Sequence, residues 1–510
     1  MLNATPLLKL YAKIRRAKLN RTNYAEQQEQ ELLKLVKISQ NTEFGIEHKF
    51  NAIKSVSDFQ NRVPLRRYEQ FWEGYFKERF PKLNNITWPG VIPYFAVSSG
   101  TTSGTTKWIP YTHEMTSSNA KAGVDLLVHH VTQNPASRLM AGKSFVLGGS
   151  SELVERTPGV YSGDLSGIAV KTLPLWARAR YFPPQKLALL KNWEEKIQIL
   201  GRESLKQNIR SISGVPSWLL IFFEKMTEIV PGSGGKICNI YPKLEMLVHG
   251  GVSFAPYHKK FLELLEGSRA ELREVYPASE GFIAVGDRSY GDGLRMIIDH
   301  GIFFEFVPLE EIDKPSPTRH WVRDLELGVN YAVIITNCAG LWSYVLGDTV
   351  RFVDRDPPRL LVTGRISYYL SAFGEHVIDE ELEDSVSYAA ASISKQVVDY
   401  SVGPIFPSAS STLGGHLYVV EFAQAGVSTA EIESFAGALD KRLSERNEDY
   451  EAHRAGGYGL NPPKVILAKP GAFAAWMKSR GKLGGKHKVP RIINDTALLD
   501  SLRTFAEAYK

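Results

Sequence analysis

The sequence predicts an α/β fold divided into two domains. Short apolar runs bounded by Gly, Pro and Ser, such as residues 94–97 and 244–248, alternate with longer amphipathic segments. That alternation is typical of a mostly parallel sheet covered by helices. At 510 residues the chain is too long for one ordinary core, and its pattern changes after Arg365. We therefore expect a large domain over residues 1–365 and a smaller α+β domain over residues 366–510.

The composition excludes several classes of protein. Hydrophobic residues make up 43% of the chain and charged residues 23%, as in globular proteins that fold in water. The net charge of +6 is spread over 61 basic and 55 acidic residues, so we expect no nucleic-acid partner. The longest apolar runs, such as residues 218–223, are too short to span a bilayer, and we expect no membrane partner. No signal peptide is visible, and the two cysteines have no metal spacing, which favours a reducing cytoplasm. The composition leaves the oligomeric state open.

The elements follow from the spacing of apolar residues and from Gly and Pro. Residues 1–90 are expected to be mainly helical, because apolar side chains recur among charged ones. The expected strands are at 94–97, 108–111, 145–149, 244–248, 274–277, 301–308, 331–336, 361–365 and 414–422. The expected helices are at 112–130, over 184–230 with an interruption at 213–218, and at 255–267, 379–387 and 428–446.

One stretch, SSGTTSGTTK at residues 98–107, follows the first expected strand. Nine of its ten residues are Ser, Thr or Gly, and the tenth is Lys107. Backbone N–H groups, hydroxyls and a lysine are the groups that hold a polyphosphate. A flexible linker has the same composition. The stretch is not a Walker A loop, because Thr105 stands where a second Gly is required and Trp108 follows the lysine.

Two carboxylates stand near the ends of later expected strands. Glu280 lies in YPASEG at residues 276–281, at the edge where ligands of open α/β sheets bind. It suits a Mg²⁺ held against phosphates, and it also suits an ordinary turn with a solvated side chain. Asp348 follows Gly347 and suits either a turn or the ribose hydroxyls of a nucleotide.

In this order, the segments resemble the adenylate-forming enzymes. Within them they are most similar to the acyl-acid amido synthetases known from auxin-responsive plant proteins, the Gretchen Hagen three family. The Ser/Thr/Gly stretch resembles the first ATP motif of that family, YxxSEG the second, and YxxGD at residues 344–348 the third. Further similar segments are TEFG at 42–45 with His48, GVPSW at 214–218, NxxYxxxR at 447–454 and KVPR at 488–491.

The resemblance implies a ligase that uses ATP and Mg²⁺. A carboxylic acid would be converted to acyl-AMP with release of pyrophosphate, and an amine, expected to be an amino acid, would then displace AMP. It also implies a large adenylate-forming domain and a mobile lid that is hinged after Arg365. The implied ATP-binding residues are Ser98, Ser99, Thr101, Thr102, Lys107, Gly250, Gly251, Ser279, Glu280, Gly281, Phe303, Asp348, Arg365 and Lys488. Glu280 is the implied Mg²⁺ ligand, and Glu280 and Lys488 are the implied catalytic residues.

The catalytic cation has two candidates in GKLGGKHKVPR at residues 481–491. Adenylation needs a cation where charge develops between the carboxylate and the α-phosphate. Lys488 matches the KxPR of the family, whereas Lys486 matches the Gly-Lys pattern of the wider superfamily, and we choose Lys488. A solvated basic loop is the simpler alternative.

The chain departs from the plant members at two positions. Phe303 stands where they tend to have Tyr before FEF, and His487 stands where Tyr or Phe usually precedes the lysine. These departures leave the acyl acid unidentified. Two other functions stay open: an acyl-CoA ligase with the same first step, and a non-catalytic protein that binds ATP and an acyl acid.

Overall fold

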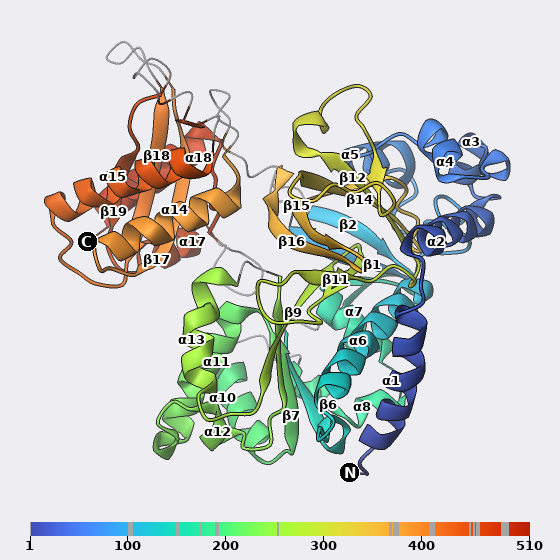
Figure 1. Cartoon of the computed structure of the whole chain (residues 1–510), viewed down its shortest axis with the longest axis horizontal. Helices are drawn as coiled ribbons and strands as arrows, with labels where there is room; N and C mark the ends of the chain where they lie inside the picture. Colours follow the sequence, from blue (N-terminus) through green and yellow to red (C-terminus); the bar gives the residue numbers. More distant parts are fainter. Residues whose placement is uncertain are drawn as a thin grey trace. The chain divides into compact units, whose positions relative to one another are not determined.

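The chain folds into two compact units (Figure 1). The larger comprises Met1–Leu346 and Val350–Val362, and the smaller comprises Gly347–Thr349 and Thr363–Lys510. An α/β fold with a larger amino-terminal and a smaller carboxy-terminal part is thereby confirmed. The computed structural model describes residues 2–99, 106–148, 153–173, 175–188, 193–251, 254–366, 370, 377–406, 414–447, 450–451, 454, 460–480 and 489–509.

The amino-terminal segment is helical, as predicted. Several of its helices start at a side chain that accepts a hydrogen bond from the backbone N–H three residues on: Asn23, Thr42 and Ser55. The helices are α1 (Thr5–Leu19), α2 (Tyr24–Ser39), α3 (Glu43–Glu47), α4 (Val56–Arg62) and α5 (Tyr68–Phe71).

The larger unit is built on a 12-stranded sheet in the order β13-β12-β14-β15-β16-β11-β10-β9-β8-β7-β3-β6. Its strands are β3 (Lys143–Leu147), β6 (Tyr181–Phe182), β7 (Ile209–Gly214), β8 (Met246–Gly250), β9 (Glu271–Ala278), β10 (Gly281–Val285), β11 (Leu294–Met296), β12 (Ile302–Pro308), β13 (His320–Trp321), β14 (Asn330–Asn337), β15 (Tyr344–Arg355) and β16 (Pro358–Arg365).

The prediction of a mostly parallel sheet is correct for one half only. Strands β6, β3, β7, β8 and β9 pair in parallel. Strands β9, β10, β11 and β16 pair antiparallel, as do β13, β12 and β14. The physical reason is the length of the connections, because a two-residue turn between β9 and β10 permits only antiparallel pairing.

Helices cover both faces of the parallel half. On β8, Met246 and Val248 pack in one cluster with Ala122 and Leu126 of α6 (His113–Gln133). The alternate residue Leu247 packs in a cluster on the other face, to which α10 (Trp193–Leu205), α11 (Pro216–Ile229) and α13 (Ala255–Leu265) contribute. The remaining helices are α7 (Leu165–Thr172), α8 (Leu175–Arg178), α9 (Gln185–Ala188) and α12 (Ile237–Ile240).

Strand β7 was not predicted, since residues 184–230 were expected to be helical with an interruption. Polar residues interrupt the apolar pattern by which a buried strand is recognised in a sequence. In the structure these residues form hydrogen bonds and ion pairs inside the fold. Ser211 donates to the Ser144 hydroxyl at 2.9 Å, and Arg210 pairs with Glu245 at 2.7 Å. A strand whose polar side chains are satisfied by neighbouring strands does not look apolar in sequence.

A second sheet of the larger unit has the order β2-β1-β5-β4. Strands β1 and β2 are antiparallel, and β1 pairs in parallel with β5. The bounds are β1 (Tyr94–Ser99), β2 (Thr106–Tyr111), β4 (Leu153–Thr157) and β5 (Val160–Gly163).

The smaller unit packs helices on both faces of a three-stranded sheet. Residues of β18 alternate between two clusters: Tyr418 and Val420 pack with α14 and α15, whereas Leu417 and Val419 pack with α17 and α18. The elements are α14 (Asp379–Ser392), β17 (Val397–Ile405), β18 (Gly415–Phe422), α15 (Thr429–Arg446), β19 (Lys464–Ala468), α17 (Ala472–Ser479) and α18 (Thr496–Ala508).

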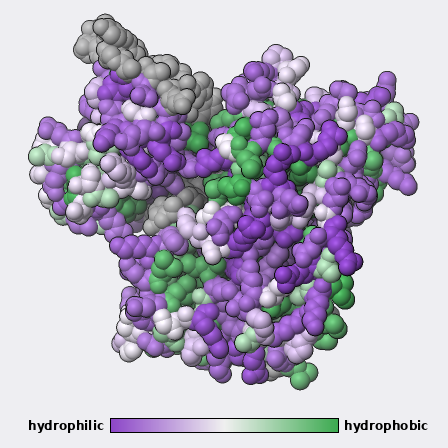
Figure 2. Space-filling view, viewed as in Figure 1, coloured by the Kyte–Doolittle hydropathy of each residue, from purple (hydrophilic) through white to green (hydrophobic). Residues whose placement is uncertain are grey.

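Most of the face visible in Figure 2 is hydrophilic. Among the helices of the described residues, none is both long enough and apolar enough to cross a membrane.

Candidate active site

The Ser/Thr/Gly stretch joins two adjacent antiparallel strands. Ser98 pairs with Lys107 and Ser99 pairs with Thr106 in the register of β1 and β2. Residues 100–105 therefore connect the two ends of a hairpin. Thr101 and Thr102 lie outside the described residues, and of Ser98 and Ser99 only the backbone is described.

Lys107 and Trp108 of β2 each lie next to a side chain from another element. The Lys107 ammonium lies 5.5 Å from the centre of the Tyr68 ring. The Tyr68 hydroxyl accepts a hydrogen bond from the backbone N–H of Trp108 at 2.8 Å, and burial raises the pKa of Tyr68 to about 12. The guanidinium of Arg156, in β4, lies 4.6 Å from the centre of the Trp108 ring. Sequence reasoning missed Arg156, because it lies two strands away from the motif.

Glu280 lies in the two-residue turn between β9 and β10. Ala278 and Gly281 are paired across the turn that Ser279 and Glu280 form. The prediction that Glu280 follows a strand end is confirmed, but the residue is only 9% exposed and is not a solvated turn residue. The Tyr344 hydroxyl lies 3.4 Å from Oε1 of Glu280. Burial and the neighbouring Glu280 charge raise the pKa of Tyr344 well above its ordinary value, so the phenol donates to the carboxylate.

Asn337, the last residue of β14, is hydrogen-bonded to this turn. Its side-chain amide donates to the backbone carbonyl of Glu280 at 2.7 Å. Its side-chain oxygen accepts from the backbone N–H groups of Ala339 and Leu341 at 3.0 and 3.1 Å. One fully buried side chain therefore fixes the Glu280 turn relative to the loop that leads into the YxxGD motif. No motif in the sequence marked it.

Ser343, directly before that motif, has a left-handed backbone with φ of 44° and is fully buried. Its backbone N–H donates to the Thr336 hydroxyl at 2.9 Å. Its own hydroxyl donates to Glu305 at 3.2 Å and accepts from Arg319 at 2.7 Å. Glu305 and Arg319 pair at 2.8 Å in the core. The network holds a conformation that a non-glycine residue rarely adopts, and it fixes the start of β15.

Strand β8 ends at Gly250, two residues beyond the predicted end at 248, and Gly251 follows it. Each glycine is required for its own reason. A Cβ at Gly250 would lie 2.2 Å from the Val275 carbonyl oxygen, so the close approach of β9 requires glycine there. Gly251 has a φ of 78° and has open space around its missing side chain. The preceding His249 is 2% exposed and stacks on Phe254 with ring centres 3.5 Å apart. Burial lowers the pKa of His249 to about 3.

Phe303 lies in the core rather than at a ligand surface. Its side chain is fully buried on β12. It contacts Phe59 and Trp321 with ring centres 6.2 and 6.1 Å away. Its place in the predicted ATP-binding set is therefore corrected to a packing role.

Asp348 lies inside β15, so the turn interpretation of this residue is wrong. Its Oδ1 pairs with Nε of Arg365 at 2.8 Å, and the two side chains are 17% and 39% exposed. Next to them, the Thr363 hydroxyl donates to the Thr349 hydroxyl at 2.9 Å. The structure brings Asp348 and Arg365 together, both within the smaller unit.

Lys488 and Lys486 lie outside the described residues. The described part of the KVPR motif is attached to β17. The Ser401 hydroxyl donates to the Pro490 carbonyl at 2.7 Å, and Arg491 pairs with Asp399 while lying 4.5 Å from the centre of the Tyr400 ring.

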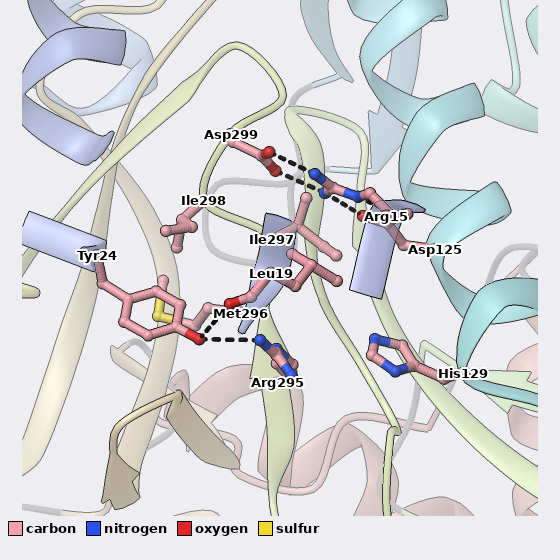
Figure 3. A pocket seen from close by; sticks show the side chains of 10 residues that line it. All are labelled: Arg15, Leu19, Tyr24, Asp125, His129, Arg295, Met296, Ile297, Ile298 and Asp299. Carbon is pink, nitrogen blue, oxygen red and sulfur yellow. Dashed lines mark hydrogen bonds and ion pairs between the residues drawn. The ribbon is translucent and has the colours of Figure 1, made fainter. Parts of the chain in front are cut away.

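A charged cluster away from these motifs is centred on Arg15 (Figure 3). The guanidinium pairs with Asp125 at 2.6 Å and with Asp299 at 2.6 Å, and His300 lies 3.0 Å from Asp125. Burial alone would raise the pKa of Asp125, but the hydrogen bonds from Arg15 and His300 lower it. Asp125, Asp299 and His300 are close enough to share a metal ion. Because Arg15 already binds both carboxylates, we assign the cluster a structural role.

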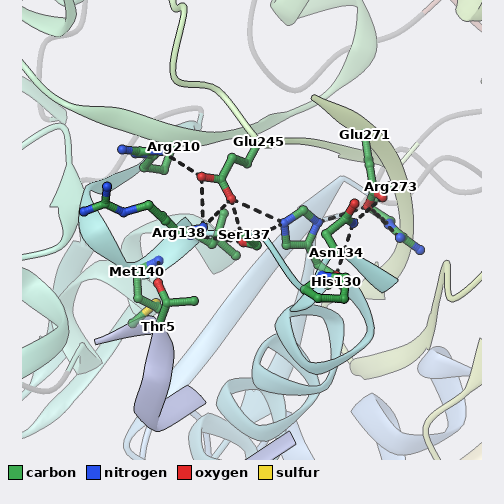
Figure 4. A network of polar contacts seen from close by, with 12 residues as sticks. Thr5, His130, Asn134, Ser137, Arg138, Met140, Arg210, Glu245, Glu271 and Arg273 are labelled. Carbon is green, nitrogen blue, oxygen red and sulfur yellow. Dashed lines mark hydrogen bonds and ion pairs between the residues drawn. The ribbon is translucent and has the colours of Figure 1, made fainter. Parts of the chain in front are cut away.

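A second polar network is centred on His130 (Figure 4). Its Nδ1 lies 3.0 Å from Glu271, and its Nε2 lies 3.2 Å from the hydroxyl of Ser137, which donates to Glu245 at 2.5 Å. Glu245 also pairs with Arg210. Arg210 and Glu271 lie near the starts of β7 and β9, so the network is at the opposite end of the parallel strands from Gly250 and Glu280. Sequence reasoning did not predict it.

The fold is shared with two ligases of known structure. The solved GH3.15 acyl acid amido synthetase matches with a TM-score of 0.76 at 17% identity, over 96% of this chain and 94% of that one. A 2-hydroxyisobutyryl-CoA ligase in its postadenylation state matches with a TM-score of 0.59 at 15% identity, over 94% and 91%.

The chain belongs to the GH3 family. The N-terminal domain of that family matches residues 13–270, its central domain residues 295–365 and its C-terminal domain residues 379–497. The indole-3-acetic acid-amido synthetase GH3.3 of Arabidopsis thaliana is 23% identical over 284 residues, 52% of this chain and 47% of that protein. In that comparison the chain spans about half the length of its relative. The jasmonoyl–L-amino acid synthetase JAR4 of Nicotiana attenuata is 23% identical over 538 residues, 92% of this chain and 91% of that protein.

Proposed function

We propose that the protein is an ATP-dependent ligase that joins a carboxylic acid to an amine, with an amino acid as the expected amine. The observation that carries this proposal is the ordered match to all three GH3 domains. The names of the plant relatives, which are amido synthetases for indole-3-acetic acid and for jasmonate, support the reaction class. The proteins are too distant for the acid itself to be carried over.

ATP would be held by three groups of residues. The hairpin that ends at Lys107 would bind the phosphates, because its backbone N–H groups and ammonium complement their charge. Gly250 and Gly251 would let the adenine lie close to the backbone, with open space beside Gly251, where a side chain is absent. Asp348, with Arg365 beside it, would accept the ribose hydroxyls.

The Glu280 side chain fits a Mg²⁺ ion. Magnesium prefers oxygen ligands and pairs with one or two carboxylates plus phosphate oxygens. Glu280 offers a carboxylate held by Tyr344 and by the turn that Asn337 fixes. When bound, the ion would neutralise charge on the phosphates.

The reaction has two steps. A carboxylate oxygen of the acid attacks the α-phosphorus of ATP, and pyrophosphate leaves. The amine nitrogen then attacks the acyl carbon, loses a proton, and expels AMP. The protein supplies charge complementarity and excludes water from the acyl adenylate, and no covalent bond to the chain is needed.

Lys488 would supply the cation for the first step, and the part of the chain that follows Arg365 would act as a mobile lid. Lids of this kind close over reactive intermediates and complete the catalytic set of residues. The match of the C-terminal GH3 domain to residues 379–497, which include Lys488, supports the assignment.

The experiment is a product screen. Pyrophosphate exchange into ATP that depends on an added carboxylic acid would separate a ligase from a non-catalytic binding protein. Mass spectrometry of products formed with a set of amino acids, or with CoA, would separate an amide from a thioester. The CoA ligase remains the second candidate because a CoA ligase shares this fold. A thioester with no amide would reject the amido synthetase proposal.

A further inference from the structure

Helix α1 has two apolar faces, and one of them is covered by the fold. Ala12 is 3% exposed and packs in a cluster with Val128 and Val131 of α6. Arg15, from the same face, is fixed between Asp125 and Asp299. These contacts hold α1 on the larger unit in one orientation.

The other face of α1 carries a row of large apolar side chains in solvent. Leu7, Leu10, Tyr11 and Ile14 are 72%, 60%, 45% and 67% exposed. Their spacing of three and four residues places them on one side of the helix. Figure 2 shows green side chains along α1 at the lower right. Single exposed apolar residues are common on protein surfaces, but a continuous helical row marks an interaction surface.

The surroundings of this row are basic. None of the first 25 residues of the chain is acidic, whereas six of them are Lys or Arg. Of these, Arg15 is buried between Asp125 and Asp299, and the exposed Lys18 also pairs with Asp299 at 3.0 Å. Lys13 and Arg16 are exposed. Near the start of the helix, Arg180 donates to the backbone carbonyl of Leu2 at 2.9 Å. An apolar row with cations beside it is complementary to a surface that is apolar inside and anionic outside.

We propose that α1 docks lengthwise on an anionic lipid bilayer, with Leu7, Leu10, Tyr11 and Ile14 among the upper acyl chains and the basic side chains at the headgroups. Long Lys and Arg side chains reach from an apolar surface to such headgroups. A second copy of this chain is a poorer occupant, because a symmetric contact would bring two basic helices together. With 15 residues α1 is too short to span a bilayer, so the proposal concerns the membrane surface alone. It departs from the expectation of no membrane partner, which rested on apolar runs too short to span a bilayer. The proposal goes beyond the ligase reaction and does not depend on it.

Flotation of the full chain with vesicles tests the apolar row. The probes are vesicles of phosphatidylcholine alone and of phosphatidylcholine with phosphatidylserine. We expect the parent to float with the anionic vesicles and to dissociate as salt is raised. Leu10→Ser with Ile14→Ser should weaken this binding at least about 10-fold. Ile46→Ser is the matched control, because Ile46 of α3 has the same 67% exposure and lies outside α1.

Charge reversal tests the basic side chains with the apolar row intact. Lys13→Glu with Arg16→Glu should weaken binding to the anionic vesicles at least about 10-fold. Lys260→Glu with Lys441→Glu, two exposed lysines elsewhere, should bind as the parent does. A parent that does not bind anionic vesicles would overturn the proposal, as would a Leu10/Ile14 variant that binds normally. A concentration-dependent dimer that this variant abolishes, without vesicle binding, would assign the surface to a second copy instead.

Discussion

Glu280 combines burial with a defined hydrogen-bond donor, and its contribution is testable by an isosteric change. Glu280→Gln keeps the shape of the turn and removes the negative charge that the proposed Mg²⁺ requires. We expect carboxylate-dependent pyrophosphate release to fall by at least about 100-fold. Tyr344→Phe, which removes only the donor at 3.4 Å, should raise the Mg²⁺ concentration needed for half-maximal rate by about 10-fold. A Gln variant that releases pyrophosphate near the parental rate would exclude Glu280 from the metal site.

Asp348 is predicted to bind the ribose while it is paired with Arg365. Asp348→Ala should weaken AMP binding by about 1.5–3 kcal/mol, the usual contribution of hydrogen bonds to a charged group. That loss corresponds to roughly 10- to 150-fold in the dissociation constant measured by calorimetry. Arg365→Lys is the comparison, since it keeps a cation beside the carboxylate. Unchanged AMP affinity in a folded Asp348→Ala protein would leave the residue with a structural ion pair only.

At the scale of single residues, the sequence predicted functional residues that lie within a recognisable motif. It missed residues whose role depends on contacts with a distant part of the chain. Glu280 could be found because it follows a strand in a recognisable segment. Asn337 and Arg156 could not, because each acts on a motif that lies far away in sequence. Phe303 was assigned to the ATP site because it matches a position of the family motif. A sequence match does not reveal the surroundings of a side chain, and Phe303 packs against Phe59 and Trp321.

Among the elements, the starts of β7, β8 and β9 are joined by the His130 network, which makes stability depend on pH. Burial alone would raise the pKa of Glu245, but the His130 ring 3.7 Å away and the hydrogen bond from Ser137 lower it to about 2. Burial alone would lower the pKa of His130, but the nearby Glu245 carboxylate and the hydrogen bond to Glu271 raise it above 6.5. The carboxylate contribution is complete above pH 4.5 and is lost as pH falls toward 2. The histidine contribution is complete below pH 6.5 and is lost as pH rises through the raised pKa.

Glu245→Gln tests this window. The change removes one charge of a buried network and should lower the free energy of unfolding by about 3–5 kcal/mol near pH 5.5. Urea unfolding of parent and variant at several pH values checks it, and the difference between the two should shrink as the pH falls toward 2 and as it rises through the raised pKa of His130. Glu203→Gln, at an exposed ion pair with Lys206, is the matched control and should change stability by under about 1 kcal/mol. A difference that stays constant with pH would contradict the network's assigned role.

The elements themselves were largely predictable where the pattern is periodic and apolar, as in α6, β8 and α13. Strand β7 was missed because Arg210 and Ser211 are polar and find their partners on neighbouring strands. The antiparallel half of the large sheet was missed because a short connection sets strand direction, and apolar periodicity carries no information about direction.

For the whole molecule, the lid proposal predicts that Lys488 is needed for the formation of acyl-AMP and not for the transfer of the acyl group to the amine. Lys488→Ala should retain ATP binding, because the Ser/Thr/Gly stretch and Asp348 would still hold the nucleotide. It should form acyl-AMP about 10²–10³ times more slowly, the usual effect of losing one electrostatic stabiliser. Supplied with acyl-AMP, it should still transfer the acyl group to an amine.

Lys486→Ala is the matched control, since it removes the same charge two residues away. A large adenylation defect in Lys486→Ala with normal Lys488→Ala would reverse the choice between them. Normal adenylation rates in both variants would mean that the basic loop is a solvated surface segment without a catalytic role.

The ion pairs of Arg15 can form only after later parts of the chain have been synthesised. The two carboxylate partners of Arg15 lie 110 and 284 residues further along the chain. A ribosome adds about 5–20 residues per second, so Asp299 leaves the ribosome roughly 15–60 s after Arg15 does. Until α6 with Asp125 has been made, both apolar faces of α1 are open to chaperones, and until Asp299 has been made Arg15 has only one of its two carboxylate partners. Helix α1 is therefore fixed in two stages, first on α6 through Asp125 and later through Asp299.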